Sequence, residues 1–264
     1  GQIIVPLHPD DPLYVEGSPT NFLALDRVTN FTGREQRNKT TPFVDQNQTY
    51  TSNPSHQVFL REYTLVGGDP VPTGRLLEQP GVGGLATWRD VKAQALTMLG
   101  IELDDLDVVA VPAVVTDPYG RFVPGPNGFP VYPLVAGGTV EGNPANPVDA
   151  SLVIKVGQAF LDDIAHEASP LSSDGRVRPG PNNPPAADPD LSPYDPELLA
   201  DHFITGDGRG NENIALSAVH HVFHSEHNRM ADNIRAILDL PGNTALHDAY
   251  AAAGFWDLNE RIFQ

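Results

Sequence analysis

Glycine and proline interrupt regular structure along most of this chain, which has 24 glycines and 26 prolines among its 264 residues. Proline breaks helix interiors and central strands, and glycine favours turns. Hydrophobic residues still make up 40% of the sequence, enough to build a core, so the chain is not simply disordered. The composition predicts a loop-rich fold, of one large or two small domains, with a few helices and long ordered connections.

Clear helix signals appear at only a few places. In "ATWRDVKAQALTMLGI", Thr87 and Asp90 form a capping box and Gly100 is a stop signal, so we expect a helix between them. Its apolar stripe consists of Trp88, Val91, Ala95 and Leu99. Shorter helices are expected over residues 57–63, over residues 156–168, and from residue 257 onward.

The longest predicted helix covers residues 214–238 and contains four histidines within eight residues. At 100° per residue, one apolar face is expected to consist of Leu216, Val219, Phe223, Met230, Ile234 and Ile237. His220 and His227 lie at the edge of that face. Two interpretations remain open: the histidines are bonded locally at the edge of the core, or His220, His224 and His227 bind zinc. The His-Glu-x-x-His pattern of zinc proteases is absent.

The charge of the chain limits its partners. Asp and Glu number 34 against 16 Lys and Arg, a net charge of −18, which argues against nucleic acid and anionic membranes. No signal peptide or apolar run of membrane-spanning length is present. Cysteine is absent, which excludes disulfides and thiolate metal ligands.

The stretch "TTPFVDQN" carries oxygen-bearing groups at alternate positions. In an extended loop, Thr41, Phe43, Asp45 and Asn47 would turn a hydroxyl, a backbone carbonyl, a carboxylate and an amide oxygen to one side. Hard oxygen ligands of this kind suit calcium. The same alternation also occurs in edge strands, so the pattern alone is a weak signal.

Residues 206–231 closely resemble the animal-type haem peroxidases, the superfamily of myeloperoxidase, thyroid peroxidase and the cyclooxygenases. The family pattern Gly-Asp-x-Arg-x-x-Glu is matched by Gly206, Asp207, Arg209 and Glu212. A histidine follows the arginine by eleven residues, and "EHNRMA" follows from Glu226, both at the family spacing. The "TTPFVDQN" stretch is similar to the family's calcium loop, with Asn47 where serine is usual.

The resemblance implies a mainly α fold with long irregular loops and a set of functional residues. Arg209 would be the catalytic arginine beside haem b, and Glu212 the glutamate that can form an ester with a haem methyl. Thr41, Phe43, Asp45 and Asn47 would bind calcium, and the histidines of the long helix would brace the scaffold. The implied reaction is reduction of hydrogen peroxide coupled to oxidation of a halide, a phenol or Mn(II).

The resemblance also implies that residues 1–264 are the middle section of one peroxidase domain. Residues 1–64 would carry the calcium loop, residues 65–200 a loop-rich insertion typical of secreted bacterial members, and residues 201–264 the arginine and the core helix. The two haem-facing histidines are expected outside the chain, because Asp201-His202 is a poor match to the distal motif. The remaining segments of the same protein would then be its partners. Two alternatives stay open: a non-catalytic calcium-binding or assembly module on the same scaffold, and a metalloprotein built on the histidine helix.

Overall fold

A computed structural model describes residues 3–6, 16, 22–25, 47–51, 53–161, 199–252 and 257–264. The chain divides into two compact units, residues 1–45 and residues 46–264. The first unit contains one antiparallel pair of strands, β1 (Ile3–Pro6) and β2 (Phe22–Leu25). All other described elements belong to the second unit.

The second unit begins with a short helix that runs straight into a hairpin. A 3-10 turn, η1 (Asn47–Thr49), precedes α1 (Pro54–Leu60), and Asn53 caps α1 by accepting hydrogen bonds from the backbone of its first turn. Strands β3 (Arg61–Val66) and β4 (Asp69–Leu76) then pair antiparallel. Gly67 and Gly68 make the turn between them with φ of 67° and 105°, which glycine adopts without strain.

The predicted helix after Thr87 is confirmed, including its cap and its stop. Helix α2 (Trp88–Gln94) starts at a capping box between Thr87 and Asp90, continues as a π-helical turn η2 (Ala95–Leu99), and ends at Gly100 in the left-handed region. Position 100 requires glycine for two reasons: its φ is 67°, and an added Cβ would lie 2.1 Å from the backbone nitrogen of Asn143.

Residues 101–161 form short ladders linked by turns. Strand β5 (Ile101–Glu102) pairs parallel with β8 (Val148–Asp149), and β6 (Val131–Pro133) pairs antiparallel with β7 (Thr139–Glu141). The 3-10 turn η3 (Asp105–Val109) follows β5, and η4 (Ala150–Leu152) follows β8.

The helix expected over residues 156–168 is wrong for residues 156–161, which are not helical. Backbone groups of this stretch bond across the chain instead: Val156 donates to the carbonyl of Val111 at 2.9 Å, and Phe160 to that of Val108 at 2.8 Å. These long-range bonds satisfy the groups that a helix would have used. Residues 162–168 lie outside the described residues.

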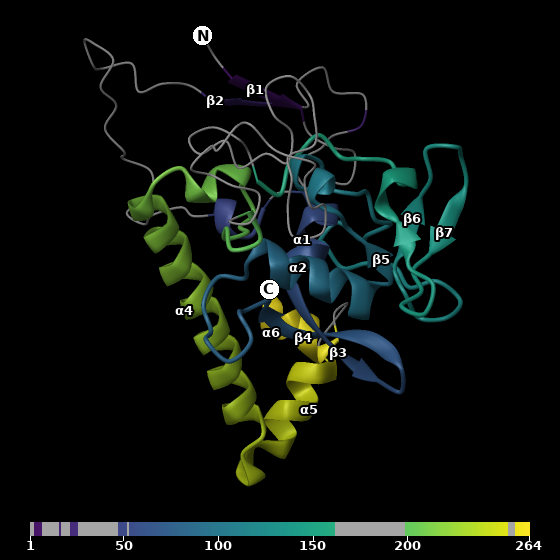
Figure 1. The fold of residues 1–264 in the computed structure, drawn as a ribbon. Coiled ribbons are helices and arrows are strands. Elements are labelled where there is room, and N and C mark those ends of the chain that lie inside the picture. Colours follow the sequence, from purple (N-terminus) through teal and green to yellow (C-terminus); the bar gives the residue numbers. More distant parts are fainter. Residues whose placement is uncertain are drawn as a thin grey trace, which may run out of the picture. The chain divides into compact units, whose positions relative to one another are not determined.

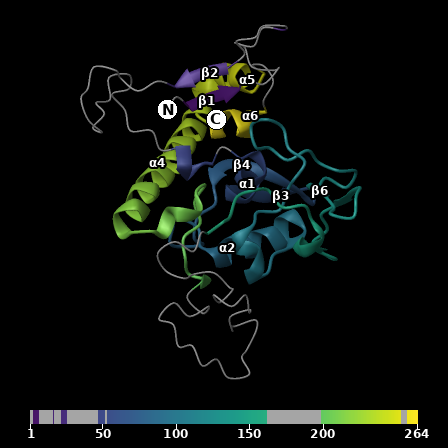
Figure 2. The ribbon, with the colours of Figure 1, turned by 90° about the horizontal axis from the view of Figure 1, so that it is seen from above.

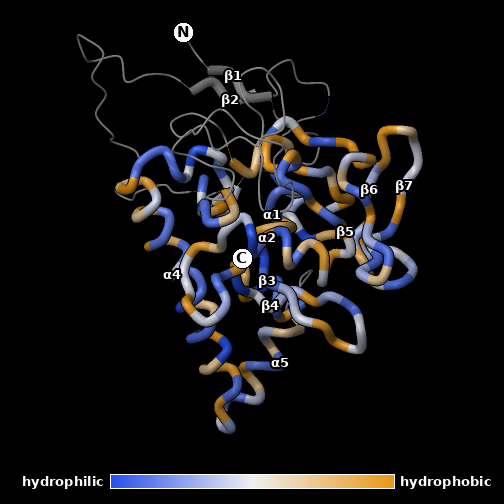
Figure 3. Tube along the Cα trace, in the orientation of Figure 1, coloured by the Kyte–Doolittle hydropathy of each residue, from blue (hydrophilic) through white to orange (hydrophobic). Residues whose placement is uncertain are grey.

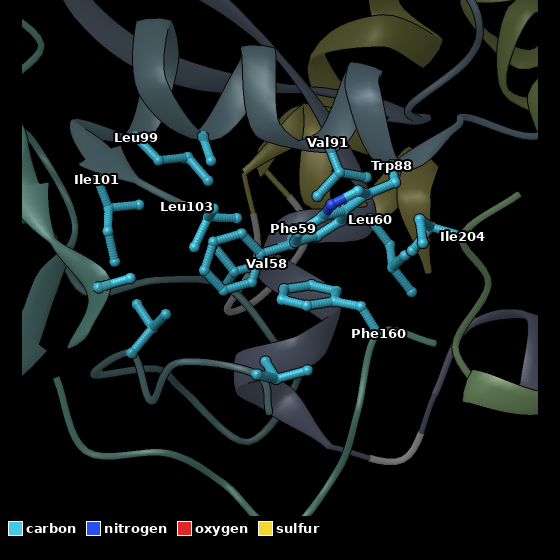
Figure 4. Packing of buried hydrophobic residues seen from close by; sticks show 14 of the residues in the cluster. Val58, Phe59, Leu60, Trp88, Val91, Leu99, Ile101, Leu103, Phe160 and Ile204 are labelled. Carbon is cyan, nitrogen blue, oxygen red and sulfur yellow. The ribbon is translucent and has the colours of Figure 1, made fainter. Parts of the chain in front are cut away.

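The main core joins α1, α2 and the ladders (Figure 4). Val58 and Phe59 of α1, Trp88 of α2 and Phe160 are at most 1% exposed. The ring of Phe160 lies 5.3 Å from that of Phe59 and 5.1 Å from that of Trp88. Residues 53–161 therefore supply most of this core, although much of the segment looked like a loop-rich insertion in the sequence.

The C-terminal part is helical, as expected for a mainly α fold. The expectation holds only in part for the whole chain, because it does not include the short ladders of residues 101–161. Turn η5 (Gly208–Asn211) leads into the long helix α4 (Ile214–Leu238), which has the predicted bounds and is capped by Asn213. After η6 (Pro241–Asn243), α5 (Thr244–Ala252) folds back beside α4, and α6 (Leu258–Phe263) packs on β4 and α4 (Figures 1 and 2). Among the described residues, no helix combines the length and the apolar character needed to cross a membrane.

The buried face of α4 differs from the predicted one. Val219, Met230 and Ile237 are 39%, 51% and 51% exposed. The buried positions are His220, His224, Asn228, Ala231 and Leu238. In Figure 3, hydrophilic and hydrophobic residues alternate along the helix. The helix turns this face toward the core instead of the predicted apolar one, because imidazole, amide and guanidinium groups of this face bond to backbone atoms of the neighbouring segments. The periodicity of apolar residues cannot predict such contacts.

A buried ion pair fastens α6 to the core. The Arg61 guanidinium donates to both carboxylate oxygens of Glu260, at 2.6 and 3.1 Å, and the two side chains are 0% and 1% exposed. Arg61 also donates to the carbonyl of Tyr119 at 2.8 Å and lies 3.8 Å above the ring of Phe263.

Candidate active site

The turn that carries Arg209 is built from close backbone contacts. The Gly206 amide donates to the carbonyl of Thr49 at 3.1 Å, and a Cβ on Gly206 would lie 2.1 Å from the backbone nitrogen of Thr51. Only glycine fits this contact. The Asp207 carboxylate then caps η5 by accepting from the backbone nitrogen of Arg209 at 3.0 Å. The "GDGR" sequence thus folds locally into a turn that is fixed against residues 47–51.

The Arg209 guanidinium is oriented by the same carboxylate. Its Nε and Nη2 donate to the two oxygens of Asp207 at 2.8 and 2.6 Å, a bidentate pair. The Arg209 side chain remains 55% exposed. Hydrogen bonding to Arg209 lowers the pKa of Asp207, so the carboxylate stays ionised at neutral pH. A planar, permanently charged group is therefore held at the surface in a defined orientation.

An open cavity of about 570 Å³ lies next to this guanidinium. Residues 206–209 form one wall, and Val109 with residues 156–159 form the other. The second wall comes from the segment between residues 65 and 200, which the family resemblance interprets as a loop-rich insertion. The cavity lining, as far as the structure describes it, contains no histidine and so no imidazole ligand for a haem iron.

A buried histidine lies behind the cavity and was missed in the sequence. His56, in the first turn of α1, is 0% exposed, and neither ring nitrogen has a partner at hydrogen-bonding geometry. Burial lowers the pKa of His56 to about 4, and the nearby Gln158 and Asp207 only partly offset this effect. The imidazole is therefore neutral at physiological pH. Both Gln158 and Asp207 also line the cavity.

The segment next to His56 contains the one non-glycine residue with positive φ in the described part of the chain. Thr51 has φ of 63°, an outlier for a β-branched residue. Its hydroxyl donates to Oε1 of Gln158 at 3.3 Å. No sequence signal marks Thr51 or Gln158, because the contact joins positions that are far apart in the chain.

The α4 histidines bond to neighbouring segments. His220 shares a hydrogen bond with the Thr49 hydroxyl at 2.9 Å, His224 donates to the carbonyl of Leu77 at 2.9 Å, and His227 donates to that of Phe263 at 2.9 Å. Burial lowers the pKa of His220, and that of His224 to about 4, so both are neutral. No group of three or more His, Asp or Glu side chains able to hold a metal occurs among the described residues.

The remaining predicted site residues are only partly placed. Glu212 is exposed at the end of η5, where its amide donates to the carbonyl of Arg209 at 2.8 Å, and it does not line the cavity. Of the predicted calcium ligands, Asn47 lies in η1, whereas Thr41, Phe43 and Asp45 lie outside the described residues.

Comparison with known proteins supports the motif. The animal haem peroxidase family model matches residues 172–248, a range that includes the Arg209 turn, Glu212 and all of α4. No curated protein and no solved structure matches the chain. Residues 172–248 are thus similar to the animal haem peroxidase family, in agreement with the motif from Gly206 onward.

Proposed function

We propose that this chain is part of a haem peroxidase, which reduces hydrogen peroxide and oxidises a small donor such as a halide, a phenol or Mn(II). The observation that carries the proposal is the placement of Arg209: the arginine of the matched family sequence stands beside an open cavity, held by a bidentate bond to Asp207. The acidic chain favours a small substrate over nucleic acid.

The residues at the cavity fit one side of a haem site. A half-exposed guanidinium suits a group that presents anionic oxygens. The carboxylate for an ester would be that of Glu212, which is exposed three residues further along and does not line the cavity. Haem b, when bound, would supply the redox chemistry. Arg209 would bind peroxide oxygen and stabilise the negative charge that develops as the O–O bond breaks. The iron ligand would come from outside the described cavity lining.

Calcium binding by Thr41, Phe43, Asp45 and Asn47 forms part of the proposal. The segment directly after these residues supports this part of the proposal, because Thr49 bonds to His220 of α4 and to Gly206 of the turn that carries Arg209. An ion bound directly before this segment would therefore also stabilise the turn that holds Arg209. We further propose that the protein is a secreted bacterial one and that other segments of the same protein complete its haem site.

The role of Arg209 is tested by Arg209→Lys in the haem-loaded protein. Lysine keeps the charge and loses the planar, oriented donor pair, so the rate of reaction with peroxide should fall by about a hundredfold or more. Arg229→Lys is the matched control, since Arg229 is an exposed arginine of α4 that pairs with Glu226. A parent-like rate for Arg209→Lys would refute the assignment. If the protein purified together with its remaining segments shows no Soret band, the non-catalytic calcium-binding or assembly module becomes the better account.

Calcium is tested with Asp45→Ala and with a chelator. If the ion binds only the folded protein, either change should lower the melting temperature, and added calcium should restore that of the chelated parent but not that of the variant. Asp69→Ala, in the β3–β4 hairpin, is the control. Melting that is independent of calcium, with no ion found by elemental analysis, would exclude the loop as a calcium site.

A further inference from the structure

Three unusual features meet behind the cavity at Arg209. Thr51 holds a positive φ that β-branched residues avoid, His56 is buried with two unpartnered ring nitrogens, and Gln158 forms part of the cavity wall. Each of the first two costs stability. Strained backbone and unsatisfied buried groups persist mainly where function requires them, and here both adjoin the same glutamine.

The contacts of Gln158 determine which way its amide group faces. Its Oε1 accepts the Thr51 hydroxyl at 3.3 Å. His56 lies close enough for Gln158 to raise the imidazole pKa, as a carbonyl that accepts from a ring N–H does, although the pair is not aligned as a full hydrogen bond. One carbonyl oxygen has two lone pairs, which these two donors can share. The amide nitrogen is then left for another acceptor, and Gln158 is one of the residues that line the cavity.

We propose that Gln158 is a ligand-binding residue of the Arg209 cavity, and that Thr51 and His56 are positioning residues that turn its N–H donors toward the ligand. The ligand class is a small molecule with an acceptor oxygen, which is hydrogen peroxide if the proposed function, on which this inference rests, is correct. Gln158 and Arg209, which come from the two segments that line the cavity, would both bind it.

The charge distribution favours a neutral donor at this position. Asp207 also lines the cavity, and both its carboxylate oxygens already accept hydrogen bonds from Arg209. An amide at Gln158 adds hydrogen-bond donors without a further charge. A carboxylate at the same position would have nearly the same shape, would accept only, and would face Asp207 across the cavity.

The orientation of Gln158 is tested by NMR on the full chain, without any activity measurement. Gln158→Glu assigns the side-chain amide signal by removing it. Thr51→Val keeps the branched shape and loses the hydroxyl, and His56→Phe keeps a ring and loses both nitrogens. Each should shift the Gln158 amide pair and speed its proton exchange with water. His247→Phe, at a histidine of α5 whose ring contacts Asp248, should not. An unchanged Gln158 signal in Thr51→Val and His56→Phe would overturn the positioning role.

Ligand binding is tested in the haem-loaded protein with hydrogen peroxide. Gln158→Glu should raise KM for peroxide about tenfold, because a donor to the ligand is replaced by a charged acceptor. Gln79→Glu is the control, since Gln79 bonds to the carbonyl of Leu85 away from the cavity. A parent-like KM for Gln158→Glu, while Arg209→Lys reacts slowly, would overturn this inference and leave the proposed function intact. A parent-like rate for Arg209→Lys would refute the proposed function, and the NMR result would then decide the orientation of Gln158 alone.

Discussion

Removing one partner of the Arg61–Glu260 ion pair should destabilise the protein strongly. Both side chains are at most 1% exposed, and the guanidinium makes two contacts with the carboxylate, at 2.6 and 3.1 Å. In Glu260→Gln the shape is kept, but an arginine that is permanently charged stays in the core without its counterion. Breaking a buried pair in this way costs about 3–5 kcal/mol. For a unit of residues 46–264, that corresponds to a fall in Tm of about 6–20 °C.

A double-mutant cycle tests the cause of the loss. Arg61→Met combined with Glu260→Met removes both charges and keeps apolar volume, so it should be less destabilising than either single change to an uncharged residue. Urea unfolding followed by circular dichroism gives the four free energies. Arg229 and Glu226, an ion pair on the exposed side of α4, provide the control, and Glu226→Gln should leave the unfolding midpoint unchanged.

The reasoning fails if Glu260→Gln loses less than about 1 kcal/mol, which is the range of solvent-exposed pairs. It also fails if the single changes simply add in the double variant, because the two charges would then not be interacting. Either result would mean that water reaches the pair, although the Tyr119 carbonyl and the Phe263 ring enclose the guanidinium.

Two further predictions concern the scaffold around the site. Folding lowers the pKa of His56 and of His224 from 6.5 to about 4. Between these two pH values the unfolded chain therefore binds more protons than the folded protein. The free energy of unfolding should then fall as the pH drops from about 6.5 to 4, by about 3 kcal/mol per histidine. Urea unfolding at several pH values measures this, and His56→Phe should reduce the slope. In the same assay, Asn228→Ala should lower the free energy of unfolding by about 2–3 kcal/mol, because the amide bonds to both backbone groups of Leu76, at 2.8 and 2.9 Å. Asn233→Ala, on the exposed side of α4, is the control and should be nearly neutral.

Elements with local signals could be predicted from the sequence. The bounds of α4 and the cap and stop of α2 follow from side chains within a few residues of each end. The predicted start at Gln57 is too late for α1, because Asn53 followed by Pro54 is the N-terminal signal. Beyond Leu60 the expected helix gives way to β3, because its backbone pairs with β4.

Features that depend on distant partners could not be predicted. Strand β5 pairs with β8 from more than forty residues away, and neither two-residue strand is recognisable by itself. The second cavity wall has the same origin, since residues 156–159 reach Arg209 only through the fold. Arg209 was identified because its motif is local, whereas His56 and Gln158 carry no local mark and are defined only by their burial and their contacts.

The polar face of α4 connects scaffold and site. His224 and Asn228, one turn apart, bond to the backbone of Leu77 and Leu76, and Arg235 bonds to that of Thr73. Hydrogen bonds are directional, so a shift of the helix by one residue would break all of these contacts, whereas an apolar face would tolerate it. The helix register in turn sets where its N-terminal end, and thus the turn with Arg209, meets the cavity. Polar residues on this face therefore cost little stability when paired and fix the position of the guanidinium. Asn228→Ala should accordingly slow the peroxide reaction as well as destabilise the fold.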